Sequence, residues 1–112
     1  MLQEPPRRPA PPNPIVQQIV SEIDAYMRQS GVRNVGWYVG ITGDVDRRMF
    51  GFHQVNRTNG AWIYRRCPSE SVARALEAEY HKAGCKGCTG GGSGDGSCTT
   101  LYAYAISLST VE

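Results

Sequence analysis

The chain lacks any long hydrophobic run and any strong excess of charge of one sign. No apolar stretch approaches the ~20 residues that cross a membrane, and no apolar segment with a cleavage site accompanies the N-terminal arginines, so we expect neither a membrane partner nor a secretory leader. The formal net charge of +2 is weakly basic. Nucleic-acid-binding domains often carry a larger basic excess, so charge alone neither supports nor excludes such a partner. We therefore expect a cytoplasmic protein, whose four cysteines are thiols or metal ligands rather than disulfides.

With 112 residues, the chain has room for one domain with a modest core. Residues 1–13 are rich in proline and contain almost nothing to bury, which predicts a disordered or polyproline-like tail. Residues 14–112 are expected to form a single domain. A loop rich in glycine and cysteine interrupts it at residues 84–98.

Two long segments have the periodicity of amphipathic helices. The first is predicted to begin after Asn13, a preferred N-cap, and to end at Gly31, which can take a left-handed conformation. The second opens at residues 67–70 and carries Glu77 at the border of its apolar stripe. We expect this carboxylate to be half-sheltered by the core and still to reach a surface cleft.

The central strand is predicted at residues 35–42, where bulky apolar side chains alternate with Gly36, Tyr38 and Gly40. The glycines on both sides of Tyr38 predict an open face that a substrate backbone could approach closely. A short helix is predicted over residues 45–53. Two further strands are predicted, at residues 61–64 and 99–106. The resulting order, helix-strand-helix-strand-helix-strand, indicates an α+β fold with helices flanking a small three-stranded sheet.

Residues 38–42 (Tyr-Val-Gly-Ile-Thr), followed by Arg48 ten residues after the tyrosine, resemble the second signature of the GIY-YIG nuclease superfamily. A histidine often follows the arginine in that pattern, and His53 lies one residue later than the pattern expects. Residues 73–77 (Ala-Arg-Ala-Leu-Glu) match the context of the family's helix-borne acidic residue, which places Glu77 in that position. The resemblance covers residues 36 to 104.

The first signature of the family, a Gly-Ile-Tyr strand just before the second, is absent. A helix and residues 31–34 stand in its place. We hypothesise that the strand at 99–106 pairs beside the central strand, as in a circular permutation. Tyr102 or Tyr104 would then supply the missing tyrosine beside Tyr38.

The resemblance implies a metal-dependent endonuclease that hydrolyses phosphodiester bonds, with DNA as the expected substrate. Glu77 would hold Mg²⁺, a hard cation suited to carboxylate and phosphate oxygens. Arg48 would contact the non-bridging phosphate oxygens. Tyr38, or a tyrosine of the last strand, would orient or deprotonate water, and His53 would shuttle protons or contact a phosphate. The choice between DNA and RNA and the oligomeric state stay open.

Each of these residues also has a plain structural explanation. Tyr38 could be an ordinary half-exposed strand residue, Arg48 a helix-surface charge, and Glu77 a partner of a basic residue at helical spacing. A different functional class therefore stays open, a non-catalytic nucleic-acid or protein-interaction module on a nuclease-like fold. In that class Trp62, Tyr64 and the paired arginines would serve binding alone.

The cysteines suggest a separate site. Cys85 and Cys88 form a C-x-x-C knuckle, and Cys98 follows on the far side of the glycine loop. With Cys67 or His81 they could complete a tetrahedral zinc site that staples the loop to the helix. Free thiols, or a disulfide from Cys98 to one member of the knuckle, are the alternatives.

Overall fold

The computed structural model describes residues 13–87 and 96–112, so the predictions for most of the proline-rich tail, for much of the glycine loop and for Cys88 lie outside the described residues. Within them, no helix has the length and apolar character to cross a membrane. The elements are, in order, α1 (Pro14–Ser30), η1 (Asn34–Gly36), β1 (Trp37–Thr42), η2 (Asp46–Phe52), β2 (Trp62–Arg66), α2 (Glu70–Lys82) and β3 (Thr100–Ala105).

The predicted order of helices and strands is confirmed, and the fold is a small α+β structure with a three-stranded antiparallel sheet. The ends of α1 are also as expected. The Asn13 side chain accepts a hydrogen bond from the Ile15 N–H at 2.8 Å, and Gly31 ends the helix at φ 74°. Ser69 caps α2 in the same way, by accepting a hydrogen bond from the Val72 N–H.

The strand order is β1-β3-β2, with β3 at the centre. Tyr38 lies opposite Tyr104 and Gly40 lies opposite Tyr102, so the hypothesis that the last strand pairs beside residues 35–42 is confirmed. The prediction that residues 35–42 form the central strand is wrong. Instead of a further strand, the segment around Lys86 hydrogen-bonds the outer edge of β1.

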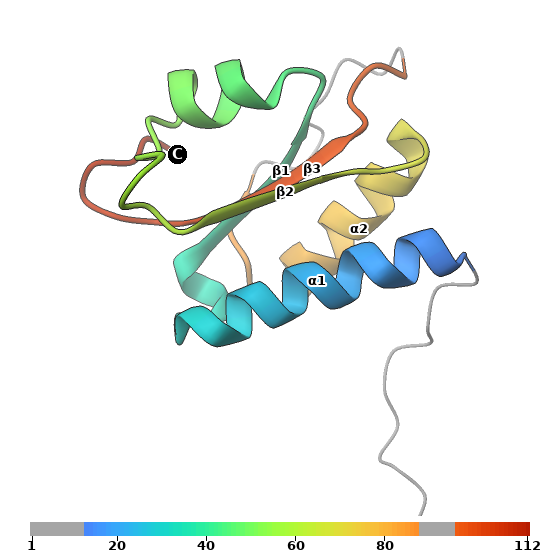
Figure 1. The fold of residues 1–112 in the computed structure, drawn as a ribbon, viewed down its shortest axis with the longest axis horizontal. Coiled ribbons are helices and arrows are strands. Elements are labelled where there is room, and N and C mark those ends of the chain that lie inside the picture. Colours follow the sequence, from blue (N-terminus) through green and yellow to red (C-terminus); the bar gives the residue numbers. More distant parts are fainter. Residues whose placement is uncertain (1–12, 88–95) are drawn as a thin grey trace, which may run out of the picture.

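The two faces of the sheet are covered differently. Figure 1 shows α1 and α2 on one face and η2, the green coil, over the other. Trp37, Val39 and Leu101 point into the core beneath the two long helices. The alternate residues of β1 and β3, with Met49 of η2, form a second buried cluster on the opposite face.

The expectation of an open face around Tyr38 is wrong. All six residues of β1 are buried, and the Tyr38 side chain is only 4% exposed. The space beside Gly40 holds the ring of Tyr102, because a Cβ at position 40 would lie 2.6 Å from the Tyr102 hydroxyl. The glycine thus admits a neighbouring side chain of the same protein rather than a substrate backbone.

Candidate functional site

Four side chains from three separate segments of the sequence meet beneath η2. We call Tyr38, His53, Tyr102 and Tyr104 the tyrosine–histidine cluster. The Tyr38 and Tyr104 rings stack with centroids 5.1 Å apart and planes 15° apart, and the Tyr38 and His53 centroids are 4.6 Å apart. The cluster exists because β3 pairs with β1 and brings both of its tyrosines onto the face that η2 covers.

His53 connects the phenols of this cluster. Its Nδ1 lies 2.5 Å from the carbonyl oxygen of Val111, and its Nε2 lies 2.9 Å from the Tyr102 hydroxyl. A carbonyl only accepts hydrogen bonds, so Nδ1 of the neutral ring carries the proton and Nε2 accepts from Tyr102. The Tyr104 hydroxyl lies 2.9 Å from the same Nδ1 and donates a hydrogen bond to the Val111 carbonyl oxygen. The chain Tyr102–His53–Val111 is therefore a directed hydrogen-bond relay.

Arg48 joins the cluster through the unusual winding of η2. This element is a π-helix, in which the His53 N–H donates to the Arg48 carbonyl at 2.9 Å, five residues back. The wide turn therefore places residue 53 directly above residue 48 along the helix axis. In an α-helix, residue 52 would occupy that place. The Arg48 side chain is exposed and lies over the Phe52 ring, 4.7 Å from its centroid.

Burial sets the protonation of the cluster. It lowers the pKa of His53 below its ordinary 6.5, although the Val111 carbonyl opposes this, and the charge of Arg48 lowers the pKa further. Burial also raises the pKa of Tyr104 far above its ordinary value. At neutral pH the cluster therefore holds a neutral imidazole and, at Tyr104, a protonated phenol.

Glu77 lies on α2 and makes no hydrogen bond or ion pair with any other described residue. Its side chain is only 6% exposed, well beyond the half-sheltering expected from the sequence. Burial raises the pKa of this carboxyl, partly offset by the charges of His81 and Arg74. The pairing of Glu77 with His81 or Arg74 that helical spacing suggests is therefore only an electrostatic attraction between separated side chains, without a hydrogen bond or ion pair.

The location of Glu77 follows from its neighbour one turn on. The Nε2 atom of His81 lies 2.9 Å from the carbonyl oxygen of Val39, on the outer edge of β1. Gly87 permits this approach, because a Cβ there would collide with the imidazole. Residues four apart share one side of a helix, so Glu77 faces the same strand edge. The structure thus brings five of the six predicted catalytic residues together and leaves Glu77 at the edge of β1, without a contact to the others in the described part.

The donor set at Glu77 fits magnesium. Mg²⁺ is commonly held by one or two carboxylates together with waters and substrate phosphates, so a single buried carboxylate with no described partner suits it. Across residues 13–87 and 96–112, no three His, Cys, Asp or Glu side chains gather as a metal site built from protein alone would need.

The cysteines lie apart. Cys98 is at the beginning of α2, where its N–H donates to Glu70, whereas Cys85 follows the end of that helix. The 13 residues of α2 span roughly 18 Å, a separation that does not favour one zinc ion shared by Cys85 and Cys98. Burial, aided by the charge of Asp24, raises the pKa of Cys85 to about 11, which disfavours the thiolate that zinc requires.

Two contributions were not foreseen from the sequence. The first is the Val111 carbonyl that orients His53. It is a backbone group, so the residue types in the sequence could not predict it. The second contribution comes from Glu70, which lies in the first turn of α2 and forms an ion pair with Arg74. Its carboxylate also accepts hydrogen bonds from the Gly96 and Cys98 N–H groups, which fasten the chain before β3 to α2.

No family model, curated protein or solved structure matches this chain. The resemblance to GIY-YIG nucleases therefore stays a prediction from the sequence motifs alone. The geometry that bears on it is the tyrosine–histidine cluster, the neighbouring Arg48 and the buried Glu77.

Proposed function

We propose that the protein is a metal-dependent endonuclease that hydrolyses phosphodiester bonds of DNA. The observation that carries the proposal is the pairing of β3 with β1, which gathers Tyr38 and Tyr104 with His53. The resemblance requires a second tyrosine beside Tyr38, and the last strand supplies it. The π-helical turn is a further support, because it compensates for the extra residue between Arg48 and His53.

The proposed role of Arg48 is to hold the scissile phosphate. Its guanidinium is exposed and lies beside the cluster, close enough for its charge to lower the pKa of both His53 and Tyr104. A planar guanidinium fits the non-bridging oxygens of a phosphodiester and stabilises the charge that grows on them.

Tyr102 and His53 are the candidates for moving a proton. Tyr102 donates to His53 Nε2, and the neutral imidazole can accept the phenol proton while the Val111 carbonyl fixes its orientation. Tyr104, whose pKa is raised, stays protonated and would orient water as a donor rather than act as a base. Tyr38 packs between these groups and would position them.

Glu77 is the proposed ligand for Mg²⁺. The ion, when bound, would stabilise negative charge on the leaving oxygen. Glu77 faces the outer edge of β1, and the Tyr102 hydroxyl lies over Gly40 of the same strand. A phosphate that contacted both groups would have to reach the outer edge of β1, where Lys86 pairs with the strand, so the Lys86 segment would have to move aside.

The cluster is closed in the structure. Tyr102, Tyr104 and His53 are at most 1% exposed. Val111 is held against His53 by two hydrogen bonds, one between its carbonyl oxygen and the imidazole Nδ1 and one from its N–H to the His53 carbonyl oxygen. Catalysis therefore requires residues 107–112 or η2 to move aside. The test is nicking of supercoiled plasmid by the purified chain in Mg²⁺ and in EDTA, where cleavage only with Mg²⁺ supports the proposal and no cleavage in either refutes it.

The second candidate is a non-catalytic nucleic-acid-binding module. The observation that favours it is the burial of Tyr102 and Tyr104, whose hydroxyls are both hydrogen-bonded within the protein as in an ordinary polar core. In that case the chain would bind DNA without nicking it, and Mg²⁺ would not change the result.

A further inference from the structure

We propose that Trp62, Tyr64 and Arg66 of β2 form a stacking platform that binds an unpaired nucleic-acid strand. The inference rests on the proposed nucleic-acid substrate and narrows it to DNA segments whose bases are unpaired and free to stack, such as those that negative supercoiling opens in a plasmid. It concerns binding, so it does not need the cluster to be catalytic.

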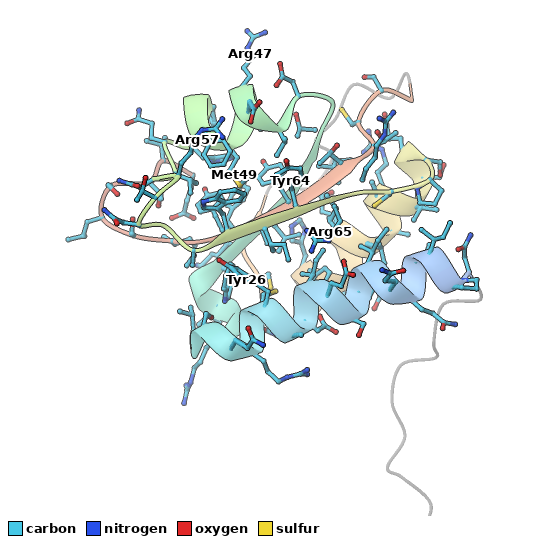
Figure 2. All side chains as sticks on the ribbon, viewed as in Figure 1. Tyr26, Arg47, Met49, Arg57, Tyr64 and Arg65 are labelled. Atoms are coloured by element: carbon cyan, nitrogen blue, oxygen red, sulfur yellow. The ribbon has the colours of Figure 1, made fainter. Side chains whose placement is uncertain are left out.

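The platform lies on the side of the sheet that carries η2. Successive residues of a strand point to opposite faces, so Trp62, Tyr64 and Arg66 share one face. Arg65 confirms the alternation, because it pairs with Glu22 of α1 at 2.6 Å on the other face. Figure 2 shows Tyr64 above β2 and Arg65 below it.

The rings of the platform are arranged before any ligand arrives. Trp62 and Tyr64 lie with their planes only 11° apart and their centroids 6.1 Å apart. The Trp62 indole is held by an edge contact with Phe50 and by the hydrogen bond from its Nε1 to the Arg57 carbonyl at 3.1 Å. Prearranged rings lose little freedom when a base stacks on them.

Tyr64 is the accessible end of this stack. Its side chain is 41% exposed, and Arg66, two residues on and about 6.6 Å along the strand, is exposed as well. A base that stacks on the free face of Tyr64 would place its phosphate near Arg66. Aromatic faces accept any base, so such binding tolerates many sequences.

The charge around the platform is complementary to phosphate. The Arg66 and Arg47 guanidiniums form no ion pair or hydrogen bond with other described residues, and Arg47 projects from η2 away from the sheet (Figure 2). The nearby carboxylates are engaged, because Asp46 pairs with Arg57 at 2.8 Å and Asp44 accepts the Arg47 backbone N–H. Positive charge therefore remains available on this side.

Two other modes of binding suit this surface less well. At Trp62 the outer edge of β2 is occupied, because its N–H donates to the Tyr26 hydroxyl of α1 at 3.0 Å, and this blocks addition of another strand there. Double-stranded DNA hides the faces of its bases within the stack, so it cannot use an aromatic platform of this kind.

The test is binding by the full chain in EDTA, where no metal-dependent cleavage occurs. The probe is a fluorescein-labelled oligothymidylate of about 12 nucleotides, compared with a duplex of the same length by fluorescence anisotropy. We expect the single strand to bind at least tenfold more tightly and to quench tryptophan emission. The signal would report Trp62, because the only other tryptophan, Trp37, is 0% exposed beneath the helices.

Three variants make the test specific. Tyr64→Thr removes the ring and keeps a strand-forming residue, so it should weaken binding about 5-fold to 100-fold, whereas Tyr64→Phe should retain it. Arg66→Ala should reduce the slope of log affinity against log salt by about 0.7. Arg33→Ala removes an equal charge beyond the end of α1 and should change affinity by less than ~2-fold.

Equal affinity of Tyr64→Thr and the wild-type chain, with both folded by circular dichroism, would overturn the platform. So would equal binding of duplex and single strand. A dimer that Tyr64→Thr dissociates, in a chain that binds no oligonucleotide, would assign the surface to a second copy instead. Binding of the single strand without any nicking would support the platform and refute the nuclease. Nicking that is unchanged in Tyr64→Thr would support the nuclease and refute the platform.

Discussion

Gly40 lies directly opposite Tyr102 in the β1–β3 ladder, and the phenol ring of Tyr102 folds across the space that a side chain at position 40 would fill. A Cβ at this position would lie 2.6 Å from the hydroxyl and 2.7 Å from the ring carbon that bears it. This pairing keeps the Tyr102 hydroxyl over β1 and within 2.9 Å of His53 Nε2. A strand glycine and a tyrosine 62 positions later are thus one structural unit.

Gly40→Ala should destabilise the fold, because the added methyl group displaces the Tyr102 ring. We expect a loss of about 1–3 kcal/mol in the free energy of unfolding, measured by urea denaturation. Gly51→Ala is the matched control, since its Cβ would meet only the Asp46 carbonyl at an ordinary 3.9 Å. The control should be neutral or slightly stabilising. Equal effects of the two changes would contradict the assigned pairing.

The buried His53 should make stability depend on pH. Its pKa is lowered in the folded chain, so the unfolded chain takes up the proton first as the pH falls. The contribution of His53 to the free energy of unfolding is therefore complete above about pH 6.5. Below that pH it declines by at most ~1.4 kcal/mol per pH unit.

The measurement is Tm between pH 5 and 8 for the wild-type chain and for His53→Gln, which can keep hydrogen bonds to Tyr102 and Val111. The difference between the two curves isolates His53 from other groups. In particular, Glu77 should change stability with pH in the opposite direction. Its pKa is raised in the folded chain, so its contribution to the free energy of unfolding is lost as the pH rises. Parallel curves would show that His53 is not held neutral.

Arg48→Ala should slow plasmid nicking by about 10²-fold or more, because a donor to the charged phosphate is lost. Arg48→Lys should recover only part of the rate, since an ammonium lacks the planar fork. Arg33→Ala, which removes an exposed charge elsewhere, serves as the control. Unchanged initial rates for a folded Arg48→Ala protein would remove this residue from the proposed site.

The Cys85 thiol should resist alkylation in the folded chain. Burial raises its pKa to about 11, so at pH 8 very little thiolate is present. Mass spectrometry after timed treatment with iodoacetamide should show slower labelling of Cys85 in the native protein than in urea. Equal rates in the two states would indicate that Cys85 is not protected as the structure describes.

Much of the fold could be predicted because local chemistry determines it. Asn13 and Gly31 define α1 through capping groups next to each other in the chain, and the alternation in β1 predicts a strand whatever its partners. The neighbourhood of Tyr38 and Tyr104 could be hypothesised because a missing signature required a substitute, but the sequence alone did not determine it.

The rest depends on distant parts of the chain. The openness of the Tyr38 face was mispredicted because its cover comes from η2 and Tyr102, which no local pattern reveals. The position of β1 at the sheet edge depends on β3, which pairs between β1 and β2 although it comes last in the chain. The tautomer of His53 depends on the Val111 carbonyl. In each case a long-range contact decided between alternatives that local propensity left equal.

Glu77 is the residue on which the proposed chemistry most depends. Glu77→Gln keeps the shape of the side chain and removes the charge, and because burial penalises that charge the variant should be at least as stable as the wild-type chain. Glu79→Gln is the matched control on the same helix, at a carboxylate that lies 3.7 Å from Lys82 and is 43% exposed.

The most direct measurement is the initial rate of Mg²⁺-dependent plasmid nicking by the wild-type chain, Glu77→Gln and Glu79→Gln, with Tm recorded for each. We predict nicking by the wild type and by Glu79→Gln, and a loss of about 10²-fold or more in Glu77→Gln without a fall in Tm. Nicking by Glu77→Gln at the wild-type rate, or no nicking by the wild-type chain in Mg²⁺, would contradict the account.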